Sequence, residues 1–130
     1  MVVIRKRAIQ LGIAAICGIV VLHAVNTFGC NNSASSGSFV ASFVIFVFPP
    51  LIPAILSLAS ANPLRSVGAS LFLAPWLLLA YYVDCVQPYS GGGASMIYVA
   101  ILFCGTPSAI LGALVTGPIL RMVGIQLGGR

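Results

Sequence analysis

Four long runs of apolar residues, separated by short polar segments, dominate the pattern along the chain. The runs cover Ala8–Phe28, Phe39–Ala61, Val67–Val83 and Met96–Thr116. Each run has the length of about 17–25 residues that a helix needs to cross the hydrocarbon core of a membrane. Connections 29–38 and 84–95 are rich in Gly and Ser, as turns between helices are, and connection 62–66 is very short. We therefore expect an all-α polytopic membrane protein, with residues 1–130 forming one domain of four transmembrane helices.

Charge is scarce and lies at the ends of these runs. Charged residues make up 5% of the chain, against about 25% in soluble domains. The basic residues are Arg5, Lys6, Arg7, Arg65, Arg121 and Arg130. When the connections are counted alternately, all of them fall on one side, and the single acidic residue, Asp84, falls on the other. The positive-inside rule then predicts an integral protein of the bacterial inner (plasma) membrane with both termini cytoplasmic. The same distribution argues against binding to nucleic acid.

The alternative interpretation of the first run is a signal peptide, in which the basic residues 5–7 form the positively charged start. Its apolar stretch is about 20 residues long, whereas the apolar part of a signal peptide has about 7–15. The length favours a transmembrane helix.

The chain resembles itself at an offset of 55 residues, since Cys30 and Cys85 are 55 positions apart and other matches share this spacing. The matched pairs include Cys30 with Cys85, Phe48 with Phe103, Pro63 with Pro118 and, after one inserted residue, Arg65 with Arg121. This pattern predicts two tandem-duplicated helical hairpins in parallel orientation, related by an axis along the membrane normal. The alternative is chance matching within a sequence of membrane composition.

Two cysteines, Cys30 and Cys85, fall at the starts of the two outer connections. The space outside a bacterial inner membrane is oxidising. We expect a disulfide that joins the two hairpins, and the alternative is a pair of free thiols near the lipid headgroups.

A second polar feature combines His23, near the outer end of the first run, with Asp84, at the outer end of the third. The two lie at similar depth and form a candidate polar pair. Ionisable groups near the membrane are functional suspects. The alternative is that each is solvated at the interface and has no further role.

Several prolines lie inside the predicted helices. We expect Pro49, Pro50, Pro53, Pro75 and Pro107 to kink their helices, either as part of a gate or as bends that improve packing.

Small residues recur every four positions in the fourth run, at Gly105, Ala109, Ala113 and Gly117. Such spacing lets helices approach closely and predicts a packing face, directed to another helix of this chain or to a partner protein.

The functional expectation rests on what the sequence lacks. No Asp, Glu, Lys or Arg occupies the middle of a run, and we identify no catalytic, cofactor-binding or metal-binding residues. We therefore expect a non-catalytic membrane protein that acts as an accessory or assembly subunit, or as an immunity-type binding partner, in contact with lipid and with a membrane-protein partner or itself. The alternative is a small homo-oligomeric channel or transporter for a neutral or anionic solute, with support from the repeat and the prolines. A third possibility is a thiol sensor formed by Cys30 and Cys85.

Overall fold

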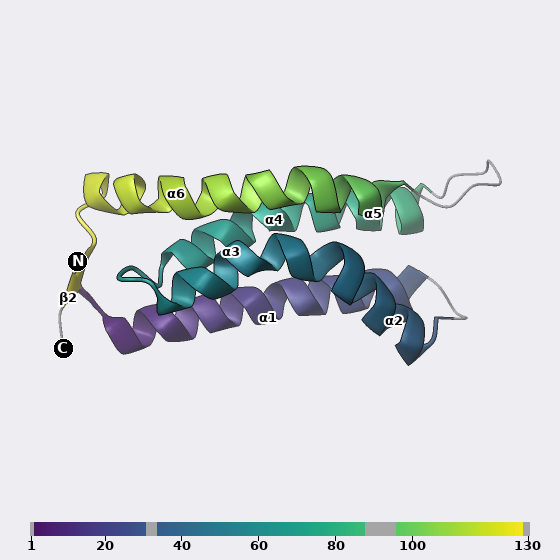
Figure 1. Cartoon of the computed structure of the whole chain (residues 1–130), viewed down its shortest axis with the longest axis horizontal. Coiled ribbons are helices and arrows are strands. Elements are labelled where there is room, and N and C mark those ends of the chain that lie inside the picture. The colour runs from purple at the N-terminus through teal and green to yellow at the C-terminus, as the bar shows by residue number, and fades with distance from the viewer. Residues whose placement is uncertain (1, 31–33, 88–95, 129–130) are drawn as a thin grey trace.

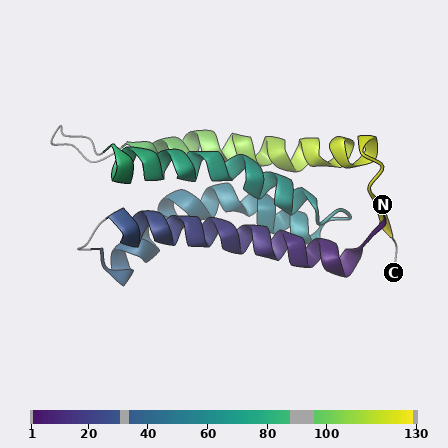
Figure 2. The ribbon, with the colours of Figure 1, turned by 180° about the vertical axis from the view of Figure 1, so that it is seen from behind.

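The computed structural model describes residues 2–30, 34–87 and 96–128, and it confirms four helices that are long and apolar enough to cross a membrane. The spans are Arg5–Cys30, Ser36–Ala59, Arg65–Val86 and Ile97–Met122. They run side by side with alternating direction (Figures 1 and 2). Most large apolar side chains on their outer surfaces are exposed, as expected of a surface that faces lipid.

The helices are continuous but not uniform. The first span is α1 (Arg5–Cys30), and the second combines α2 (Ser36–Ser42), the π-helical segment η1 (Phe43–Val47) and α3 (Phe48–Ala59). The third combines α4 (Arg65–Tyr81) with η2 (Tyr82–Val86), and the fourth combines α5 (Ile97–Ala100), η3 (Ile101–Gly105) and α6 (Thr106–Met122). Two short strands, β1 (Val2–Ile4) and β2 (Gln126–Gly128), pair in parallel.

The first, third and fourth spans are longer than their apolar runs, whereas the second ends at Ala59, before the end of its run. In the fourth span, α6 extends to Met122. Pro118 lies inside α6 and does not end it, because a proline removes only one backbone bond and neighbouring groups in a membrane protein can replace it. The helix ends instead at Met122, and Gly124, which follows the capping residue Val123, has a φ of 73°. The Ile125 amide donates to the Leu120 carbonyl and the Gly124 amide to that of Arg121, which together form a Schellman cap.

The two ends of the bundle carry different groups. Both termini, the β1–β2 pair and the α3–α4 connection lie at one end, which we call the N/C end (Figure 1). Cys30 and Cys85 lie at the other, which we call the disulfide end. Parts of both connections at the disulfide end, 31–33 and 88–95, fall outside the described residues.

The core is built around α4, which packs against each of the other three spans. Leu73 and Leu77 of α4 are fully buried, together with Leu51 of α3 and Ile101 of η3. The closest approach joins α4 to α6 at Gly68 and Gly112: a Cβ atom at position 68 would lie 2.6 Å from the Gly112 carbonyl oxygen. The two hairpins pack unequally, since α4 contacts α6 extensively whereas α1 contacts α3 little, so a pseudo-twofold relation of the hairpins is not evident.

Candidate functional site

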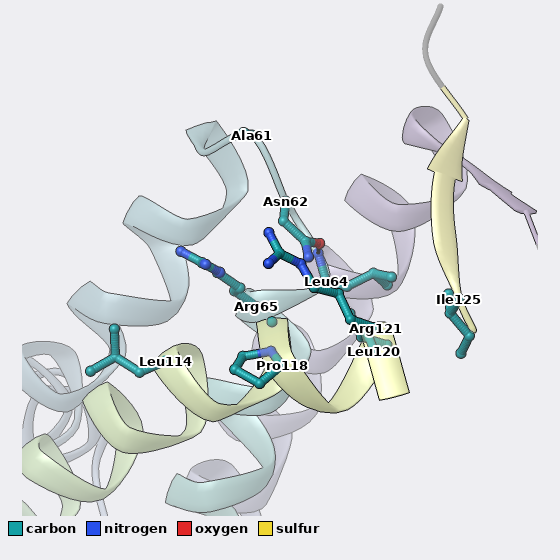
Figure 3. Close-up of a pocket in the computed structure, with 10 residues that line it drawn as sticks. Ala61, Asn62, Leu64, Arg65, Leu114, Pro118, Leu120, Arg121 and Ile125 are labelled. Atoms are coloured by element: carbon teal, nitrogen blue, oxygen red, sulfur yellow. Dashed lines mark hydrogen bonds between the residues drawn. The ribbon is translucent and has the colours of Figure 1, made fainter. Parts of the chain in front are cut away.

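Two arginines from different helices meet at a cavity at the N/C end. Arg65 is the first residue of α4, and Arg121 lies in the last turn of α6. The cavity has a volume of about 700 Å³ and is also lined by the α3–α4 connection and by Ile125. Figure 3 shows the two guanidinium groups projecting to the same side of α6. The cavity is thus a concave site lined by two cationic groups, of which Arg65 is half-buried and Arg121 is exposed.

The α3–α4 connection that presents Arg65 is a tightly bonded turn. Ser60 Oγ donates to the Asn62 carbonyl over 3.1 Å, and Asn62 Oδ1 accepts the Leu64 amide over 3.2 Å. The Arg65 amide donates to the Asn62 carbonyl over 3.2 Å. Because the oxygen of the Asn62 side chain is engaged, its amide NH₂ remains as a donor at the cavity wall.

The Arg65 side chain packs against α6 at Gly117. A Cβ atom at position 117 would lie 3.0 Å from Arg65 Nη2, so only a glycine leaves full room for the guanidinium. Arg65 Nε is buried, and within the described residues it has no hydrogen-bond partner. An unpaired buried donor costs about 1–3 kcal/mol. The site therefore holds an unsatisfied cationic donor in a fixed position.

The charge at this cavity has no acidic counterpart close by. Asp84 is the only acidic side chain of the sequence. It follows Arg65 by 19 residues in one continuous span, which places it roughly 28 Å away along the helix axis, at the disulfide end. The arginine cavity is therefore electropositive, and it suits an anion with oxygen atoms that accept from guanidinium groups.

A second cavity adjoins the first and shares Arg65 and Leu114 with it. It has a volume of about 260 Å³ and lies between α3 and α6. Its other lining residues are Pro53, Leu56, Ser57, Ser60, Ile110 and Ala113. The arginine cavity thus lies beside a mainly apolar groove between α3 and α6, which extends along α6 to Ile110.

The structure does not place His23 and Asp84 in a hydrogen bond. His23 is fully buried; its Nε2 lies 3.2 Å from Ser42 Oγ and 3.4 Å from the Phe39 carbonyl, and its Nδ1 has no partner among the described residues. The Tyr98 ring packs edge-on to His23 and is itself within electrostatic range of Asp84. Tyr98, from the fourth span, therefore interacts with both members of the expected pair.

The expected disulfide residues do come together. Cys30, the last residue of α1, and Cys85, in η2, lie at disulfide distance with Cα atoms 5.0 Å apart. The bridge ties the first span to the third at the end opposite the arginine cavity. The other cysteines, Cys17 and Cys104, are exposed on the outer surface of the bundle.

The small-residue face of the fourth span is used within the chain. Ala109 and Ala113 are buried, and a Cβ atom at Gly105 would lie 2.9 Å from Leu73 of α4. Gly117 accommodates Arg65. Of the two partners that the sequence left open for this face, the structure places another helix of the same chain against it.

The prolines lie at three kinds of position. Pro49 and Pro50 lie in the first turn of α3, which follows η1, and Pro107 lies in the first turn of α6, which follows η3. The wider π-helical turn precedes a residue that has no amide hydrogen to donate. Pro75 lies inside α4, and Pro53 lies inside α3, where it lines the second cavity.

Sequence reasoning missed the arginine cavity, although the repeat had aligned Arg65 with Arg121. The sequence pattern suggested for both only a role in orienting the chain in the membrane.

No protein-family model, no curated protein and no solved structure matches this chain. The case for function therefore rests on the geometry of the chain itself.

Proposed function

We propose that this chain is a non-catalytic protein of the bacterial inner membrane, with both termini in the cytoplasm, that binds an anionic group in the Arg65–Arg121 cavity. In this proposal it serves a larger membrane assembly as an accessory or assembly subunit. The observation that carries the proposal is the pair of guanidinium groups in one cavity with no acidic side chain near them. The clustering of basic residues at the N/C end supports the orientation.

The chemistry of the cavity suits binding rather than catalysis. A guanidinium group stays protonated in proteins and only donates hydrogen bonds, so neither arginine can act as a base. Its planar fork pairs well with carboxylate and phosphate oxygens. Two such forks and the Asn62 amide favour an anion with several oxygen atoms, and phosphate has both the charge and the number of acceptors.

We also propose that the two hairpins arose by duplication. Support comes from the matched cysteines at disulfide distance and the matched arginines at one cavity. The second and fourth spans each contain a π-helical segment followed by a helix with proline in its first turn. These segments begin at Phe43 and Ile101, which are 58 residues apart rather than 55, so the correspondence is shifted by about one helical turn.

The anion-binding proposal predicts a selective effect of phosphate on stability. In an uncharged detergent, sodium phosphate should raise the melting temperature of the protein relative to sodium chloride at equal ionic strength. Saturation at 100 times the Kd would add about 2.7 kcal/mol of stability. Arg121→Gln should remove most of this effect, because it deletes one of the two forks. Arg7→Gln, at an exposed position at the same end, is the matched control. An equal response of the Arg121→Gln variant and wild type would rule out the site.

Transport of an anionic solute is the second candidate function, since the same cavity would admit such a solute. Leu51, Leu73 and Ile101 fill the centre of the bundle, so transport would require α3 to move against α6. Pro50 is buried close to Gly105, where these spans meet.

The two functions differ in what the isolated protein does. If it is a transporter, liposomes that hold only this chain should take up phosphate, and Pro50→Leu or Pro53→Leu should slow uptake. Pro75→Leu, at an exposed position in α4, is the matched control. For an accessory subunit we expect no uptake, and recovery of a second membrane protein in stoichiometric amount after purification in mild detergent.

A further inference from the structure

The arginine cavity and the groove beside it are adjacent and differ in polarity. They share Arg65 and Leu114, so a ligand that occupies one lies next to the other. The charged groups are confined to the N/C end, whereas the groove has walls of Pro53, Leu56 and Ile110. A soluble anion would use only the first part of this site.

The arginine cavity and the groove together cover a depth similar to that of an acyl chain in one membrane leaflet. Ile110 precedes Arg121 by 11 residues in the same helix, which is roughly 16 Å along the axis. Half of a hydrocarbon core is about 15 Å thick. The side chains of Leu56, Ile110 and Leu114 are exposed on the outer surface of the bundle, so the groove opens toward the membrane.

We propose that the ligand of this site is a phosphate-bearing lipid, with the phosphate in the arginine cavity and an acyl chain in the groove between α3 and α6. This inference rests on the proposed function, and it adds the chemical class of the anion. The phosphate would pair with the terminal nitrogens of the two guanidinium groups that line the cavity, whose charge no acidic side chain nearby balances. The chain covers apolar walls that a soluble phosphate would leave open.

The test compares two ligands that share one headgroup. Dioctanoyl phosphatidic acid and glycerol 3-phosphate differ only in the acyl chains, and dioctanoylglycerol lacks the phosphate. Binding to the purified full chain in an uncharged detergent is followed by the shift in melting temperature over a ligand titration. We expect phosphatidic acid to bind at least about tenfold more tightly than glycerol 3-phosphate, since burying two methylene groups already suffices for that ratio. Dioctanoylglycerol should give no saturable shift.

Two substitutions on α6 separate the groove from the arginine cavity. Ile110→Trp fills the groove, and we expect it to weaken phosphatidic acid binding about tenfold, the equivalent of two methylene groups left in detergent. Glycerol 3-phosphate binding should not change, because Ile110 does not line the arginine cavity. Leu111→Trp is the matched control, since Leu111 is exposed and lines neither cavity.

The possible outcomes distinguish failure of the lipid assignment from failure of the proposed anion-binding function. Equal affinities for the two phosphate ligands, or an Ile110→Trp variant that binds phosphatidic acid as wild type does, would overturn the lipid assignment and leave a soluble-anion site. Failure of both phosphate ligands to bind would overturn the proposed function as well.

Discussion

Replacing Gly68 with alanine is expected to destabilise the bundle by about 1–3 kcal/mol, the usual cost of one extra carbon in a well-packed core. The added Cβ would meet the Gly112 carbonyl oxygen at 2.6 Å, and that oxygen belongs to the backbone of α6. A backbone atom cannot rotate away as a side chain can, so α4 and α6 must separate. Because α4 packs against all three other spans, the shift should loosen the whole bundle.

The measurement is the melting temperature of the variant in detergent, with Gly18→Ala as the matched control. Gly18 is also a helical glycine, but it lies exposed on α1, and a Cβ atom there would have no described atom within 4 Å. Alanine favours a helix over glycine, so the control should melt at the wild-type temperature or above it. Equal melting temperatures for the two variants would contradict the close contact of α4 with α6.

Replacing Arg65 with methionine should make the ligand-free protein more stable and remove its response to phosphate. Methionine keeps an unbranched side chain of similar reach but carries no buried donor without a partner, a defect that costs about 1–3 kcal/mol. The positive charge of Arg65 is also unfavourable for stability. Arg65 is the first residue of α4, and the N-terminus of a helix is the positive end of its dipole. A rise of about 1 kcal/mol in the free energy of unfolding is expected.

The substitution should raise the stability of the ligand-free protein and abolish its stabilisation by phosphate. This combination distinguishes a ligand-binding arginine from a structural one. If Arg65 only supported the fold or only oriented the chain, its replacement would lower or leave unchanged the stability, with no link to phosphate. Melting temperatures are compared in phosphate-free buffer and in phosphate, with Arg7→Met as the control at the same end. A lower melting temperature for Arg65→Met than for the control would count against the binding role.

Hydrophobicity alone predicted the four spans, because a run of about 20 apolar residues has few other ways to be satisfied. The disulfide partners followed from topology, since alternate crossing puts Cys30 and Cys85 at one end. Both predictions draw on the order of segments along the chain. Segment order places the two cysteines at one end, whereas the bridge itself also requires both side chains to point toward each other.

Predictions that depend on helix rotation were less secure. His23 lies near Ser42 Oγ and the Phe39 carbonyl, and the Tyr98 ring of the fourth span packs against it, contacts that the sequence pattern does not reveal. The arginine cavity was missed for the same reason: Arg65 and Arg121 meet only because α4 packs on α6 and Gly117 leaves space between them. The β1–β2 pair has only three residues in each strand, too few for a pattern in the sequence.

The central claim is that Arg65 and Arg121 together hold one anion, and NMR of the guanidinium groups tests it most directly. The full chain, labelled with ¹⁵N-arginine in uncharged detergent micelles, is titrated with phosphate while the Nε–H resonances are followed. The account predicts that the Arg65 and Arg121 resonances shift together and saturate at one concentration, while those of Arg5 and Arg7 barely move. Equal, unsaturated shifts of the Arg5, Arg7, Arg65 and Arg121 resonances, or an Arg65 resonance that does not respond, would contradict it.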